Sequence, residues 1–238
     1  MSVAVYVAAF IVIVVATTVQ SSIGFGANLI AMPTLALFAP QLVPAAALLA
    51  ISTMNVFMLR REHTALEVSP IANALVGRVI GTAIAVFVLA QVSEDRLDAV
   101  IGVSVLGLVA ATAYGGAPER TRATMLGAGT ISGFTAGTAG IGGPPVALMF
   151  QKAKGASIRA SMGAFFVVGT IITLIGLVIA GELGADEARW GVSLVPAAVV
   201  GFFLSGPLLP VVDRGYTRPA ILILSAAAAI VLLVRALT

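Results

Sequence analysis

The chain has 238 residues, of which 60% are hydrophobic and only 10% are charged, and its mean hydropathy is +1.12. Soluble domains carry roughly 25% charged residues, so the composition excludes an ordinary soluble fold. The apolar runs are continuous rather than alternating, which favours membrane helices over a β-barrel. The net charge of +3 is explained by basic cytoplasmic loops, and no basic stripe with interleaved aromatic residues indicates nucleic-acid binding.

The first half of the chain predicts four full membrane helices and one half-length segment. About 20 apolar residues cross a ~30 Å bilayer core at about 1.5 Å per residue. Ser69 and Pro70 are expected to open one helix as N-cap and first-turn residue. The first run has no preceding basic stretch, so we expect a membrane helix rather than a cleaved signal. The full helices are expected at 2–20, 45–59, 69–92 and 99–114, and the short segment at 28–38.

The second half repeats this order of long and short segments. We therefore expect an all-α polytopic membrane protein with two repeats, at 1–115 and 116–238, within one integral membrane domain. It would contain about eight full helices and two half-helices led by glycine and proline. The second half is expected to have full helices at 123–137, 160–180, 190–212 and 219–237, a basic loop at 152–159 and a short segment at 144–150.

The charges of the loops predict how the chain crosses the membrane. If every segment reverses the chain, one side holds nine basic residues, whereas the other holds three basic residues and six of the ten acids. The positive-inside rule makes the first side cytoplasmic and places both termini outside a bacterial-type cytoplasmic membrane. Each half then reverses direction five times, so the second repeat is predicted to be inverted relative to the first. The nine basic residues are Arg60, Arg61, Arg120, Arg122, Lys152, Lys154, Arg159, Arg214 and Arg218.

A glycine-rich stretch precedes each half-helix. Glycine permits positive φ and close backbone approach, and proline fits the first turn of a helix. A helix beginning there presents free N–H groups and a positive dipole end, which suit an anion. The predicted binding residues at these two stretches are Gly24, Gly26, Asn28, Thr138, Gly140, Gly142, Gly143 and Pro144.

Arg78 is the one basic residue within a predicted membrane span, and no acid lies inside any span. An intramembrane charge is costly and commonly functional, and a guanidinium matches an oxyanion through paired donors. The sequence leaves open that Arg78 instead snorkels to the cytoplasmic face. Nearby polar residues could line the site or simply join packed helices. They are Gln20, Ser21, Ser22, Asn55, Asn73, Thr135 and Gln151.

These motifs resemble the sulfite exporter TauE/SafE family across essentially the whole chain. Ser21-Ser-Ile-Gly-Phe-Gly26 with Pro33 is similar to the family's first-half motif, and Gly133-Phe134 with Gly140-Ile-Gly-Gly-Pro-Pro145 to its second-half motif. Gly77-Arg78-Val-Ile-Gly81 resembles its third-helix segment. The resemblance implies transport of sulfite, sulfoacetate or a related sulfur anion across the cytoplasmic membrane.

We therefore expect a secondary transporter that holds a small anion between the two glycine–proline breaks and works by alternating access. A permease for another small anion and a non-transporting assembly subunit are the alternatives. An intramembrane enzyme is disfavoured because the chain has no cysteine, one loop histidine (His63) and no buried acid, which leaves no catalytic group, metal site or cofactor site to predict. The expected partners are the anion and the lipid bilayer, and a homodimer is left open.

Overall fold

A computed structural model describes residues 1–91, 119–139, 142–179, 183–216 and 223 of the chain. Every element in these ranges is helical, which confirms the predicted all-α polytopic architecture. Within these ranges, four helical stretches are long and apolar enough to cross a membrane: Val3–Ile23, Val68–Val88, Gly155–Ile175 and Ala185–Arg214. The helix predicted at 99–114 and all of the helix predicted at 219–237 except residue 223 lie outside the described residues.

The chain forms two compact units, each of which draws on both halves of the sequence. The first unit comprises Met1–Leu66 and Gly155–Arg214, and the second comprises Glu67–Lys154 and Gly215–Thr238. The units are described separately below. The predicted repeats at 1–115 and 116–238 are defined by the similar order of segments in the two halves of the sequence. The compact units are defined by contacts, so they do not test the repeats, which stay a prediction.

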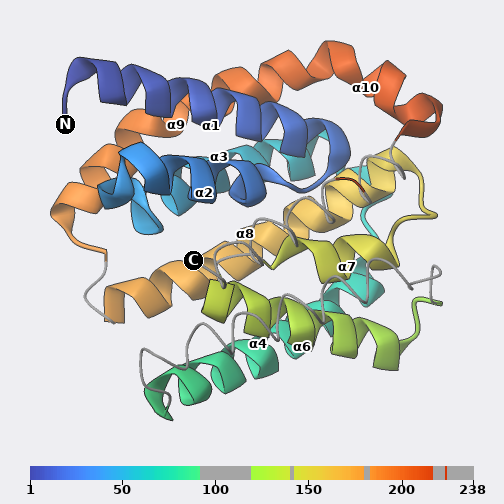
Figure 1. Cartoon of the computed structure of the whole chain (residues 1–238). Helices are drawn as coiled ribbons and strands as arrows, with labels where there is room; N and C mark the ends of the chain where they lie inside the picture. The colour runs from blue at the N-terminus through green and yellow to red at the C-terminus, as the bar shows by residue number, and fades with distance from the viewer. Residues whose placement is uncertain (92–118, 140–141, 180–182, 217–222, 224–238) are drawn as a thin grey trace. The chain divides into compact units, whose positions relative to one another are not determined.

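The first unit is a bundle of apolar helices. Helix α9 packs against both α1 and α3, and α8 packs against α3 (Figure 1). Its core contains many alanines, which let the helix backbones approach closely, together with larger residues such as Ile13 and Leu35. The bounds are α1 Val3–Ile23, α2 Ala27–Phe38, α3 Ala45–Arg61, α8 Gly155–Ile179, α9 Ala185–Ser205 and α10 Leu209–Val211, with short 3-10 turns at Pro40–Leu42, His63–Ala65 and Gly206–Leu208 and a π turn at Val212–Tyr216.

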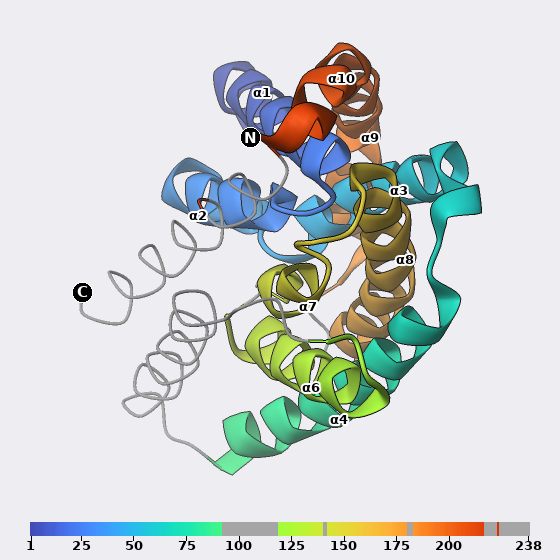
Figure 2. The same ribbon diagram turned by 90° about the vertical axis from the view of Figure 1, so that its right-hand side faces the viewer.

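The second unit contains the long helices α4 (Val68–Gln91) and α6 (Arg122–Ala139), which lie side by side (Figure 2). A Cβ added at Gly81 of α4 would overlap the carbonyl oxygen of Thr130 and come within 2.8 Å of the Phe134 nitrogen. Glycine is therefore what allows the two backbones to touch. The short helix α7 (Gly143–Met149) packs against α6, and all of its residues are buried.

An equivalent contact joins α1 and α9 in the first unit. A Cβ added at Gly201 of α9 would lie 2.5 Å from the Val14 carbonyl oxygen and 3.0 Å from the Thr18 nitrogen. In both units, glycine thus lets a helix of the first half of the chain pack closely against a helix of the second half, and Gly77, Gly129 and Gly133 make further contacts of this kind between α4 and α6.

Three predicted helix boundaries are wrong. Helix α4 begins at Val68, because Ile71 N already donates to Glu67 O, so Ser69 lies inside the first turn rather than capping it. Helix α2 begins at Ala27, so Pro33 lies within the helix and not in its first turn. Helix α8 begins at Gly155, which places Arg159 in a buried helical position and not in a basic loop.

Candidate transport site

The first glycine-rich stretch interrupts the helix as expected. Helix α1 ends at Ile23, and α2 begins at Ala27. Between them Gly24 and Gly26 have φ values of +112° and +119°, in the left-handed region that side chains rarely adopt. The interruption therefore depends on glycine at both positions, and both glycines are buried.

Two amides close this first break. Gln20 Oε1 accepts a hydrogen bond of 2.9 Å from Ala27 N, and Gln20 Nε2 donates to Asn55 Oδ1 at 2.6 Å. Gln20 thereby satisfies one of the free N–H groups at the start of α2. Asn28 differs, because its Oδ1 is buried and has no hydrogen-bond partner among the described residues. Asn28 and the buried hydroxyl of Ser21 are thus polar side chains near this break with unused hydrogen-bonding capacity among the described residues.

Two arginines that the sequence placed in cytoplasmic loops also reach the first break. Arg61 Nη2 donates to Ser21 O at 2.7 Å, and Arg159 Nη1 donates to Ser22 O at 3.2 Å. These carbonyls belong to the last turn of α1, where the helix has no further N–H donors of its own. Burial lowers the pKa of Arg61 from its usual value, while the adjacent Glu62 carboxylate opposes this shift. Both side chains therefore cap a helix end.

Arg159 is only 2% exposed and is held by two carboxylates. Its Nε donates to both oxygens of Glu62 at 2.8 and 2.9 Å, and its Nη1 and Nη2 donate to Asp213 at 2.8 and 3.1 Å. Sequence reasoning missed this cluster. The sequence did place Arg159, Glu62 and Asp213 in loops on the same predicted side of the membrane, and this was the one feature that could have indicated the cluster.

The second break brings together Arg78 of α4, Ser132 of α6 and Gly142 before α7. Arg78 is 6% exposed, and its Nη1 donates to Ser132 Oγ across 3.4 Å. The Ser132 hydroxyl donates in turn to the carbonyl oxygen of Gly142. A Cβ added at Gly142 would come within 3.0 Å of Arg78 Nη1. The guanidinium is therefore buried beside the glycine-rich stretch.

The remaining predicted residues divide between the two units. Gly143 and Pro144 open α7 and are buried. Gly140 and the side chain of Thr138 lie outside the described parts of the structure. The Thr135 hydroxyl bonds to carbonyl groups of its own helix, which is a structural role. Gln151 is buried, and its amide has no hydrogen-bond partner among the described residues.

The sequence comparison identifies the family. A family model described as Sulfite exporter TauE/SafE matches residues 9–232. The chain belongs to this family. TauE/SafE proteins are membrane transporters of sulfur anions, so this chain is a membrane transporter of that kind. No curated protein and no solved structure matches the chain.

In this TauE/SafE protein the second break offers the chemistry that an oxyanion needs. A guanidinium supplies paired donors of fixed geometry, and the Ser132 hydroxyl beside it can donate or accept a hydrogen bond. His63, in contrast, is exposed, and its ring bonds to Arg60 O at 3.0 Å, as expected for a loop residue. Across the described ranges, no three His, Asp or Glu side chains are grouped as metal ligands would be.

Proposed function

We propose that this protein exports a small sulfur anion, sulfite or an organosulfonate such as sulfoacetate, and that Arg78 binds the anion. The observation that supports this most is the burial of Arg78 in a span of membrane length, beside the glycine-rich second break. Charged groups at such depth are costly and mark substrate pathways. A planar guanidinium fork also matches the oxygens of a sulfite or sulfonate group.

The absence of a side chain at Gly142 supports the same assignment. A Cβ there would press against Ala136, the Ser132 carbonyl and the Arg78 guanidinium at 2.8–3.0 Å. Glycine thus allows the guanidinium to approach the backbone at the point where the chain unwinds. Gly24, Gly26 and Asn28 form the corresponding break of the first unit, and we assign them to the substrate pathway together with Thr138, Gly140, Gly143 and Pro144.

The two matching helix contacts support the predicted repeat. Gly81 meets Thr130 and Phe134, whereas Gly201 meets Val14 and Thr18. The partner positions are 116 residues apart (130 − 14 and 134 − 18), as are the two glycine motifs (140 − 24), whereas Gly81 and Gly201 themselves are 120 residues apart (201 − 81). Inversion of one repeat relative to the other, and transport by alternating access, are proposed on this basis.

Export of an anion from the cytoplasm needs no coupling ion. An inside-negative membrane potential drives an anion outward with roughly 2.3 kcal/mol per charge per 100 mV.

The loop charges support the proposed location in a bacterial-type cytoplasmic membrane with both termini outside. Reaction of an Ala153→Cys variant with an impermeant reagent tests this orientation, because labelling from the outside would contradict it.

Flux measurements in proteoliposomes test the proposed substrate class. Purified protein should move sulfite or sulfoacetate at a rate that depends on membrane potential and persists without a proton gradient. Chloride and acetate serve as comparison anions. Selective flux of a sulfur-free anion would favour the permease alternative, and no protein-dependent flux of any anion would favour the assembly-subunit alternative.

A further inference from the structure

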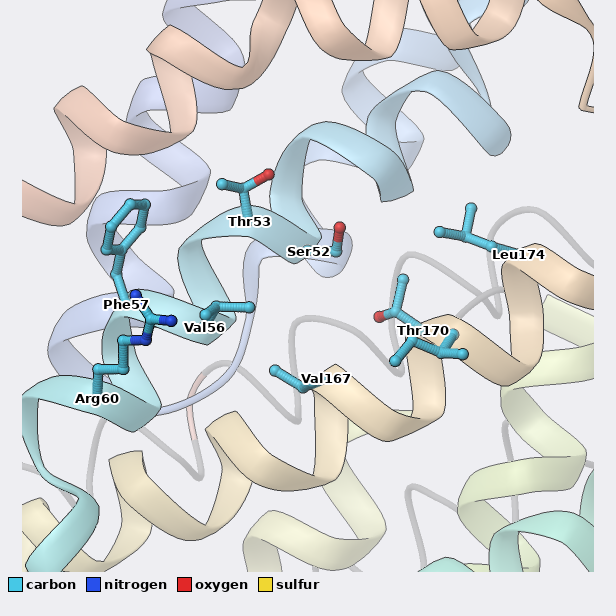
Figure 3. A pocket seen from close by; sticks show the side chains of 9 residues that line it. Ser52, Thr53, Val56, Phe57, Arg60, Val167, Thr170 and Leu174 are labelled. Carbon is cyan, nitrogen blue, oxygen red and sulfur yellow. The ribbon is translucent and has the colours of Figure 1, made fainter.

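Helices α3 and α8 of the first unit line a cavity of about 310 Å³ that is open on one side. Figure 3 shows that it is elongated along the two helices, with Arg60 and Phe57 at one end and Leu174 at the other. The volume lies at the lower end of the roughly 300–1,000 Å³ typical of ligand sites. The lining residues are Ser52, Thr53, Val56, Phe57, Arg60, Val167, Thr170, Ile171 and Leu174.

The cavity has a cation at one end. Arg60 is exposed, and no hydrogen bond or ion pair of its guanidinium with another described residue is present. Its neighbour Arg61 is engaged with Glu62, Ser205 and the Ser21 carbonyl. The positive charge at the cavity mouth is therefore that of Arg60, and it is available to a ligand.

The rest of the cavity is mainly apolar and borders a helix face suited to lipid. Val56, Val167 and Leu174 line it on both sides, and the hydroxyl side chains of Ser52, Thr53 and Thr170 lie among them (Figure 3). Along α8, Val168, Ile171 and Ile175 are 41%, 53% and 56% exposed, and their spacing places them on one face of the helix. The same helix is long and apolar enough to cross a membrane. Exposed apolar side chains on such a helix are expected to contact the acyl chains of lipids.

We propose that this cavity binds an anionic phospholipid, with the phosphate paired to Arg60 and part of one acyl chain lying between α3 and α8. Arg60 stands eight residues after Ser52 on α3, which is about 12 Å along the helix. A ligand that spans the cavity must therefore be charged at one end and hydrocarbon along its length. Arg60 also belongs to the side predicted to be cytoplasmic, where anionic lipids attract basic residues.

The transported anion is the main competitor for this cavity, and charge alone does not separate the two ligands. A small oxyanion would pair with Arg60 but would leave the apolar end of the cavity empty. A phospholipid uses both ends. The test must therefore change the charge and the apolar part independently.

Native mass spectrometry of the purified full-length protein with phosphatidylglycerol and phosphatidylcholine tests the proposal. We expect about a fivefold preference for phosphatidylglycerol, the factor that roughly 1 kcal/mol per basic residue gives. Arg60→Gln should abolish the preference, whereas Arg122→Gln, which removes an exposed arginine from α6 on the same predicted side, should keep it. Val167→Phe, which fills the cavity, should reduce binding of both lipids.

Three results would overturn the proposal. An unchanged preference in Arg60→Gln would remove the arginine from the site. Equal lipid binding by Val167→Phe and the unmodified protein would show that the acyl chain lies elsewhere. Displacement of phosphatidylglycerol by millimolar sulfite or inorganic phosphate would identify a site for small anions instead.

Discussion

The two most buried arginines of the described structure lie beside different glycine breaks and have different surroundings. Arg159, in the first unit, is 2% exposed and bonds to the carboxylates of Glu62 and Asp213. Arg78, in the second unit, is 6% exposed and donates to the hydroxyl of Ser132 beside Gly142. The two carboxylates neutralise the Arg159 guanidinium, which indicates a structural role. Burial alone therefore does not mark a binding residue, and the anion-binding role that we propose for Arg78 rests on its place in a membrane-length helix beside Gly142.

The largest loss of stability is expected from Arg159→Ala. Removing one partner of a buried ion pair leaves the other charge uncompensated, which costs about 3–5 kcal/mol. Here both Glu62 and Asp213 lose their partner, and the last turn of α1 loses a cap. Thermal unfolding in detergent, monitored by intrinsic fluorescence, measures the effect.

Arg122→Ala is the matched control for the Arg159 experiment. Arg122 is exposed at the start of α6, and surface substitutions usually change stability by about 0.5 kcal/mol or less. Equal unfolding temperatures for the two variants would mean that the ion cluster does not hold the first unit together.

A second loss is expected where glycine brings helices into contact. Gly81→Ala and Gly201→Ala each force a methyl group against a backbone carbonyl of the partner helix, and such overpacking costs about 1–3 kcal/mol. Similar losses for both variants would support equivalent roles in the two units. The unfolding temperature of each variant provides the comparison.

Gly127 provides the control for these two glycines. It lies in α6 with nothing within 4 Å of an added Cβ, so Gly127→Ala should stabilise the helix by roughly 0.5–1 kcal/mol. Destabilisation by Gly127→Ala equal to that of Gly81→Ala would show that general helix effects, rather than close helix packing, explain the result.

A loss comparable to that of the glycine variants is expected from Gln20→Leu. The variant leaves Ala27 N and Asn55 Oδ1 without the bonds they make now, and an unsatisfied buried polar group costs about 1–3 kcal/mol. Gln41→Leu changes an exposed glutamine in the same way and should have little effect. If both variants unfold alike, Gln20 does not cap α2.

Local features of the sequence predicted much of the fold. The long helices follow from continuous apolar runs, and the interruption at Gly24 and Gly26 follows from a backbone conformation that glycine alone adopts readily. Arg78 was identifiable because a cation within an apolar run is rare. Each of these signals is contained within one short stretch of chain.

Features that depend on distant residues were not predicted. Arg159 is buried against Glu62 and Asp213, which neutralise its charge. These partners lie 97 and 54 residues away in the sequence, and nothing near Arg159 in the chain reveals them. The start of α8 was misplaced for the same reason. The capping of α2 by Gln20 was also missed, because the sequence suggested only that this amide lines the site or joins packed helices, and not that it bonds to a backbone N–H.

The central claim, that Arg78 binds the transported anion, is tested most directly by sulfite efflux from proteoliposomes containing the Arg78→Gln variant. This change keeps polar donors but removes the charge. The account predicts that efflux falls at least about tenfold, since a charge-assisted hydrogen bond contributes roughly 1.5–3 kcal/mol, while Arg78→Lys retains part of the activity. Efflux by Arg78→Gln at the rate of the unmodified protein would contradict the account.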